Sequence, residues 1–161
     1  MDWETRMLEL WSSLDSLPEA EFHDRMDHLL LELPADSPIA DFERAAAQDS
    51  TGHPVEAEPL YRAALAAGLT GERRRRAVIQ LASTLRNLDR PLESIELLEP
   101  ELTGETSNLD DAVRCTLALA YSSVGRDREG LALVIEALAQ HLPRYQRSMG
   151  NYARALVSSG T

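Results

Sequence analysis

The chain has 161 residues, of which 43% are hydrophobic and 27% charged, and its formal net charge is −11. This composition is typical of a soluble globular protein, and no run approaches the roughly 18 apolar residues that a membrane-spanning helix needs. A single cysteine excludes an internal disulfide, and the acidic balance disfavours nucleic-acid binding by the whole surface. The acidic residues 1–4 lack the basic-then-apolar order of a signal peptide, which favours a cytoplasmic location.

Residues 1–35 are expected to form an acidic pair of helices that stands as an N-terminal segment of its own. Apolar residues recur there at spacings of four and three, which is one face of a helix: Trp3, Met7, Leu10, Trp11, Leu14 and Leu17. A second helix is expected to open near Pro18 and to stop at Pro34. The apolar face of the first helix either packs on the following helices as a cap or pairs with a second subunit as a homodimer. The short connection before Pro38 favours the cap.

Chemistry-bearing residues are sparse. His23, Asp24, Asp27 and His28 offer pairs at helical spacing that could bind zinc, but their acidic surroundings favour a solvated helix face. The chain contains no phosphate-binding loop, no G-x-S-x-G, no H-E-x-x-H and no paired cysteines. We therefore predict no enzymatic activity, no cofactor and no metal site. Cys115 is flanked by apolar residues and is expected to be a small core residue.

Residues 36–161 read as short helices separated by tight turns. Every segment has a period of 3.6 and none alternates as a strand does, so the sequence predicts an all-α protein of about nine helices. Connections of two to six residues make sequential helices antiparallel neighbours. Three of the turns align at Gly52, Asp89 and Gly125, which are 37 and 36 residues apart. This spacing indicates an internal repeat.

Small residues recur at fixed distances from these turns. Each turn is preceded by an alanine at matching phase and followed five residues later by another small residue, and then by a bulky one: Ala45, Ala82 and Ala118, then Ala57, Ser94 and Gly130, then Tyr61, Leu98 and Val134. Small residues let the two helices of a hairpin approach closely, and the bulky residue fills the gap beside them. The pattern predicts three helix pairs, with a final helix over residues 144–157.

This arrangement over about residues 38–160 resembles the tetratricopeptide-repeat family. It departs from the family where Asp89 replaces the turn glycine, where the period exceeds 34 residues, and where Pro59 falls inside a helix that it should kink. The resemblance implies a right-handed α–α superhelix, or solenoid, of three degenerate helix pairs over residues 36–161, with a C-terminal capping helix. It also implies a non-catalytic scaffold or adaptor for protein–protein interaction. A generic array of antiparallel helix hairpins is the alternative fold.

Four consecutive arginines, residues 73–76, cannot form one patch because residues on a helix advance about 100° each. The apolar stripe of this helix is expected to be Val78, Leu81, Leu85 and Leu88. Arg76 lies opposite that stripe, with Ile79, Gln80, Ser83, Arg86 and Asn87, and the same phase in the final helix gives Arg147, Asn151 and Arg154. In the family such residues line the concave groove. Two interpretations stay open: a solvated helix face, or a groove that binds an acidic peptide or a C-terminal carboxylate.

The stripe lacks aromatic residues for base stacking, so nucleic acid is an unlikely partner. The alternative function is a helical regulatory domain that binds nucleic acid or a small ligand.

Overall fold

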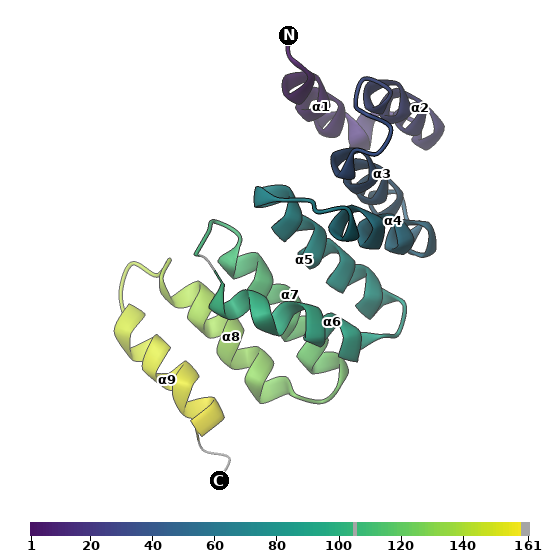
Figure 1. Ribbon diagram of the computed structural model, residues 1–161. Helices are drawn as coiled ribbons and strands as arrows, with labels where there is room; N and C mark the ends of the chain where they lie inside the picture. The colour runs from purple at the N-terminus through teal and green to yellow at the C-terminus, as the bar shows by residue number, and fades with distance from the viewer. Residues whose placement is uncertain (105, 159–161) are drawn as a thin grey trace. The chain divides into compact units, whose positions relative to one another are not determined.

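The computed structural model describes residues 1–104 and 106–158, and within these ranges it is helical with no strand. The α-helices are α1 (Trp3–Ser12), α2 (Glu19–Leu30), α3 (Pro38–Ser50), α4 (Pro54–Ala66), α5 (Gly71–Asn87), α6 (Pro91–Leu98), α7 (Asp110–Ser123), α8 (Asp127–Ala139) and α9 (Gln146–Ser158) (Figure 1). The predicted all-α class is confirmed, with α3/α4, α5/α6 and α7/α8 as the three helix pairs. The chain divides into two compact units, Met1–Ala77 and Val78–Thr161.

The turns inside the three helix pairs share one backbone geometry. Their central residues have positive φ, with values of 89° at Gly52, 59° at Asp89 and 79° at Gly125. In each turn the next residue donates its N–H to the carbonyl oxygen five residues earlier, at 2.8, 2.9 and 2.9 Å. These are Schellman motifs, which favour glycine at the left-handed position and tolerate aspartate there. The repeated turn therefore survives the replacement of glycine by Asp89.

The small residues predicted to bring the helices together are buried. Ala45, Ala82, Ala57 and Ser94 are fully inaccessible to solvent, and Ala118 is 7% exposed. Two helices come close together at Gly130, where an added Cβ would lie 2.9 Å from the backbone oxygen of Ala118. The spacing of small residues in the sequence thus corresponds to close helix contacts.

The N-terminal pair covers its own apolar face. Met7 and Leu10 of α1 are buried in one cluster with Phe22, Met26 and Leu30 of α2 and Ala40 and Ala47 of α3. The Trp11 ring meets Phe22 edge-on, with 5.4 Å between ring centroids. This packing within the unit Met1–Ala77 is the arrangement expected of a cap.

Two local expectations need correction. Cys115 is exposed and not a core residue, because α7 buries the side that carries Val113 and Leu117, and Cys115 lies about 200° from each. Val134 is 39% exposed, although it was expected to fill a gap between helices. Helix α4 continues through the exposed Pro59 as far as Ala66.

In the described part of the chain, no helix combines the length and the apolar character needed to cross a membrane.

Candidate functional site

The first turn of α5 separates its arginines into different surroundings. The Arg73 guanidinium donates to Glu43 Oε1 at 3.0 Å and to both carboxylate oxygens of Glu4 at 3.0 and 2.6 Å. Glu43 is only 1% exposed and also accepts a bond from Trp11 Nε1 at 2.9 Å. The hydrogen bonds to Glu4 and then to Glu43 raise the pKa of Arg73. Arg73 therefore fastens α1 to α3.

Arg76 also faces its own unit. Its guanidinium lies 5.2 Å from the centre of the Phe42 ring, which is within the range of a cation–π contact. Together with Arg73, Glu4 and Leu8 it lines a hollow of about 520 Å³. Arg76 was expected in a peptide groove, and its stacking on Phe42 now gives it a structural role as well.

The remaining members of the α5 stripe lie along the part of the helix that belongs to the second unit. Ile79, Gln80, Ser83 and Arg86 are half-buried and Asn87 is exposed. Arg86 Nη2 donates to Asn87 Oδ1 at 3.0 Å. An Arg–Asn pair therefore ends this helix.

The predicted residues of α9 are all exposed, and two of them line a groove. Arg147 and Arg154 border a hollow of about 1110 Å³ that α7, α8 and α9 form together. Arg154 Nη2 donates to Asn151 Oδ1 at 2.6 Å, which repeats the Arg–Asn pairing of α5. Arg147 makes no hydrogen bond or ion pair with any residue that the structure describes. Of the two α9 arginines at the groove, one is thus held in place and one is unengaged.

The opposite wall of this groove was not predicted. Asp111, in the first turn of α7, accepts bonds from Gln140 at 2.8 and 2.9 Å, from His141 Nε2 at 2.9 Å and from Arg114 at 3.2 Å. These contacts join α7 to the end of α8 and occupy the Asp111 carboxylate. The only feature of the sequence that could have indicated this wall is the spacing of three between Asp111 and Arg114 in the first turn of a helix, and such pairs are common on exposed helices.

The comparisons with known proteins agree with this repeat geometry. A family model described as "Tetratrico peptide repeat" matches residues 38–156. The chain belongs to the tetratricopeptide-repeat family. No curated protein and no solved structure matches it significantly. Tetratricopeptide repeats generally mediate protein–protein interaction, and the family is typically a non-catalytic scaffold.

Two of the tetratricopeptide pairs also share a charged feature at their turns. Arg90 donates to both oxygens of Glu93 at 2.6 and 2.8 Å, and Arg126 donates to both oxygens of Glu129 at 2.8 and 2.5 Å. The bonds from Arg126 lower the pKa of Glu129. Arg126 also lies 3.8 Å from the centre of the Tyr121 ring, and burial raises the pKa of Tyr121 to about 12. These contacts hold the start of each second helix against the turn.

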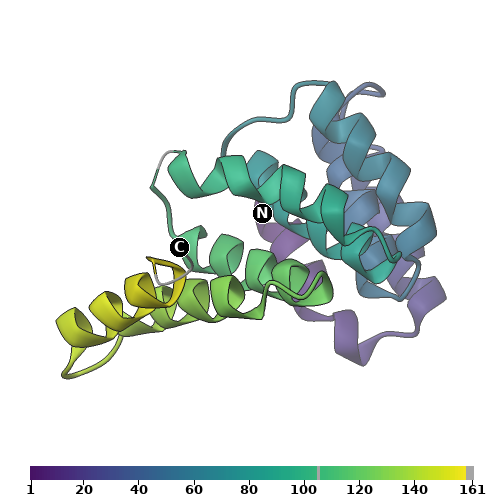
Figure 2. The same cartoon turned by 90° about the horizontal axis from the view of Figure 1, so that it is seen from below.

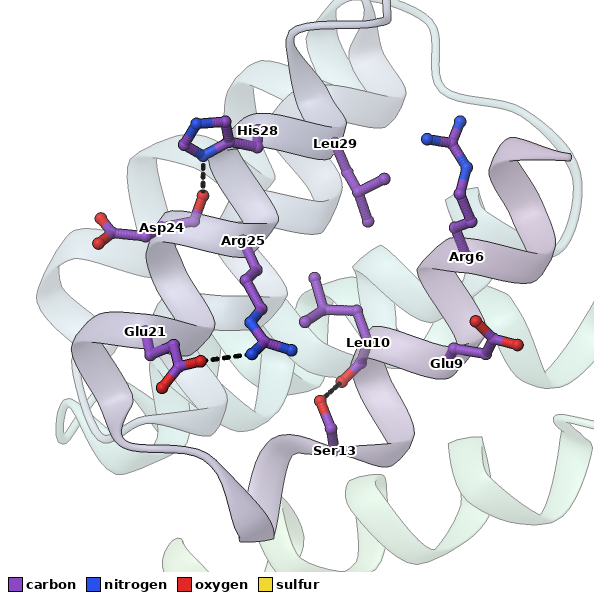
Figure 3. Close-up of a pocket in the computed structure, with 9 residues that line it drawn as sticks. All are labelled: Arg6, Glu9, Leu10, Ser13, Glu21, Asp24, Arg25, His28 and Leu29. Atoms are coloured by element: carbon purple, nitrogen blue, oxygen red, sulfur yellow. Dashed lines mark hydrogen bonds and ion pairs between the residues drawn. The ribbon is translucent and has the colours of Figure 1, made fainter. Parts of the chain in front are cut away.

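A further cleft lies outside the tetratricopeptide match, between α1 and α2. It has a volume of about 560 Å³, and Leu10 and Leu29 point toward one another across it (Figure 3). The cations on its rim are already engaged, because Arg25 pairs with Glu21 and Arg6 pairs with Glu32 at 2.6 and 2.5 Å. Because both of its arginines are paired, whereas Arg147 at the α9 groove is not, this cleft is the weaker candidate.

The two histidines of α2 have separate partners. His23 Nε2 lies 2.9 Å from Thr51 Oγ1, and His28 Nδ1 donates to the backbone oxygen of Asp24 at 2.7 Å. Among residues 1–104 and 106–158, no three His, Cys, Asp or Glu side chains are placed to share a metal ion.

Proposed function

We propose that this tetratricopeptide-repeat protein is an adaptor that binds an acidic segment or a C-terminal carboxylate of a protein partner in the groove beside α9. The observation that carries the proposal is Arg147, a guanidinium without a partner in the described chain, at a groove of about 1110 Å³. A carboxylate satisfies such a guanidinium through two parallel hydrogen bonds. The partner therefore contributes the missing anion.

The charge of α9 itself favours an anionic ligand on its side of the groove, while Asp110, Asp111 and Glu136 lie on the α7 and α8 side. Residues 144–158 contain three arginines and no Asp or Glu, in a chain with a net charge of −11. Asn151 orients Arg154, so little side-chain freedom remains to be lost when that arginine binds. The Arg86–Asn87 pair of α5, with Ile79, Gln80 and Ser83 before it on the same stripe, is the proposed extension of this surface.

The test is a titration of the full chain with two fluorescent glutamate-rich peptides, one ending in a free carboxylate and one in an amide. We expect Arg147→Glu combined with Arg154→Glu to weaken binding by about 10- to 100-fold, because hydrogen bonds to charged groups contribute about 1.5–3 kcal/mol each. Binding should also weaken as salt is added. The two peptides differ only in the terminal charge, so their affinities separate a C-terminal from an internal acidic ligand.

Arg128→Glu is the matched control, because Arg128 is an exposed arginine of α8 that does not line the groove and makes one long bond, from its Nε to the Leu156 backbone oxygen of α9 at 3.4 Å. Its affinity should stay close to that of the parent, and both variants should keep the parent melting temperature. Equal binding by the double variant and the parent would contradict the proposal. Tighter binding of an oligonucleotide than of either peptide would favour the nucleic-acid alternative.

A further inference from the structure

Helix α8 carries an uncovered apolar stripe. Leu131, Val134 and Leu138 are 51%, 39% and 57% exposed. They follow one another at spacings of three and four, so they lie on one face of the helix. Asp127 continues the same spacing at the start of the helix, whereas His141 lies beyond the end of α8 at Ala139. This spacing is that of the seam between two helices of a coiled coil.

The corresponding positions of the earlier repeats are covered by the chain itself. Val134 matches Leu98 and Tyr61, which are both fully buried, and Leu131 matches Ile95, which is 6% exposed. The side chains at these positions are apolar in all three pairs, apart from Glu58 in the first. The repeat therefore keeps an apolar surface on α8 that no described part of the chain covers.

Neither neighbour of α8 reaches this stripe. Helix α8 lies between α7 and α9 (Figures 1 and 2). Gly130 of α8 packs closely against Ala118 of α7. Ala132 and Ala139 are also buried, and they lie on a different side of α8 from Gly130. The stripe is rotated by roughly 100° from each of these two sides. It is therefore a third face of the helix, and none of Leu131, Val134 and Leu138 lines the groove of the proposed function.

We propose that a second copy of this chain covers the stripe, with the two α8 helices packed antiparallel across a two-fold axis at Val134. Such an interface must be self-complementary, and the stripe is symmetric about its centre. Each Leu131 would meet the Leu138 of the other copy, and each Val134 would meet its own equivalent. The pairing requires no rearrangement of α7 or α9.

The charges at the two ends select the antiparallel orientation. Asp127 lies at the start of the stripe, and the exposed Arg144 follows its other end, beyond His141, which is already bonded to Asp111. Antiparallel packing places the acidic end of one copy against the basic end of the other at both ends of the interface. Parallel packing would instead place the two Asp127 side chains together, and like charges repel. The charge pattern thus distinguishes this chain's own α8 from an arbitrary apolar helix as the occupant.

The first test is the mass of the full chain by light scattering over a series of concentrations. We expect a monomer–dimer equilibrium, and we expect Leu131→Glu with Leu138→Glu to raise its dissociation constant by at least about tenfold, since burying a leucine contributes about 1.5–3 kcal/mol. Leu92→Glu is the matched control, because Leu92 is 66% exposed on α6 and outside the stripe. A strictly monomeric parent would overturn the proposal.

The second test fixes the geometry and does not depend on the glutamate variants folding. In a chain with Cys115→Ser, Val134→Cys places one thiol on the proposed axis, next to its own equivalent. Mild oxidation should link this variant into a covalent dimer much faster than the matched Leu92→Cys variant, because a disulfide needs Cβ atoms about 3.5–4.5 Å apart. Equal linking rates would place any dimer contact elsewhere and overturn the α8 interface.

Discussion

Gly130 shows how single residues set the spacing of this fold. The tetratricopeptide pattern calls for alanine at this position, and the structure explains the departure. A Cβ at Gly130 would lie 2.9 Å from Ala118 O, closer than such contacts normally are, and 3.4 Å from Ala118 Cα. Both neighbours are backbone atoms, so the helices themselves would have to move apart.

We therefore expect Gly130→Ala to destabilise the protein, although alanine is the better helix former. The gain in helix propensity is about 1 kcal/mol, whereas overpacking costs about 1–3 kcal/mol. The measurement is urea unfolding followed by circular dichroism. Gly150→Ala in α9 is the matched control, because its Cβ would meet only the end of the Arg154 side chain, at 3.6 Å. We expect that control to be neutral or more stable than the parent, and a stabilised Gly130→Ala would refute the close contact.

Helix α4 holds the clearest conflict between local propensity and the fold at the level of elements. It continues from Pro54 to Ala66 with Pro59 inside it. Proline at that position has no N–H to donate to the carbonyl of Val55 four residues earlier. Pro54, in contrast, stands at the first position, where an N–H would have no partner within the helix. The tertiary contacts of Ala57, Tyr61 and Ala64, which are fully buried, hold the helix together in spite of Pro59.

Replacing Pro59 by alanine should therefore raise the stability, by about 1–3 kcal/mol, because the substitution restores one hydrogen bond and removes a clash. Pro59 is exposed, so no packing is lost. Differential scanning calorimetry of the Pro59→Ala and Pro54→Ala variants provides the comparison. Higher stability of both variants, or of Pro54→Ala alone, would contradict the prediction that only the interior proline destabilises α4.

The elements were predictable from the sequence because their signals are local. Helix periodicity, Gly52 and Gly125 at the turns, and the recurring alanines each depend on residues a few positions apart. The exposure of Arg147 and Arg154 followed from helix phase alone. The contacts of Arg73 with Glu4 connect residues 69 apart, and no periodicity reports such a pair. The exposure of Val134 could not be predicted from the sequence either. Its repeat equivalents, Tyr61 and Leu98, are buried, and only the helices packed around each position differ.

At the scale of the whole molecule, the N-terminal pair belongs with the first helix pair. The unit Met1–Ala77 contains α1 to α4 and the first turn of α5, tied together by the buried Glu43 and by Arg73. His53, in the turn between α3 and α4, also pairs with Glu19 of α2 at 2.6 Å. Charge contacts as well as apolar packing therefore attach the pair to the repeats.

Removing Arg73 should loosen this unit in particular. Arg73→Leu leaves the buried Glu43 with Trp11 as its partner, and breaking a buried ion pair costs about 3–5 kcal/mol, somewhat less here because Arg73 is partly exposed. Tryptophan fluorescence reports the effect directly, since Trp3 and Trp11 are the only tryptophans and both lie in this unit. Adding Glu43→Leu should recover part of the loss. Arg25→Leu is the control in the same unit, because Arg25 pairs with the exposed Glu21 on its own helix, and equal effects of the two arginine variants would contradict the assigned role of Arg73.

The exposed thiol of Cys115 allows the distance between the two units to be measured by fluorescence. It is the only cysteine, so one acceptor dye attaches at one defined place on α7, in the unit Val78–Thr161. The two natural donors, Trp3 and Trp11, lie in the other unit. The efficiency of resonance energy transfer from the indole rings to that dye therefore depends on the distance between the two units, and no substitution is needed to measure it. Binding of a peptide or of a second copy would be detected as a change in this efficiency if it changes the distance.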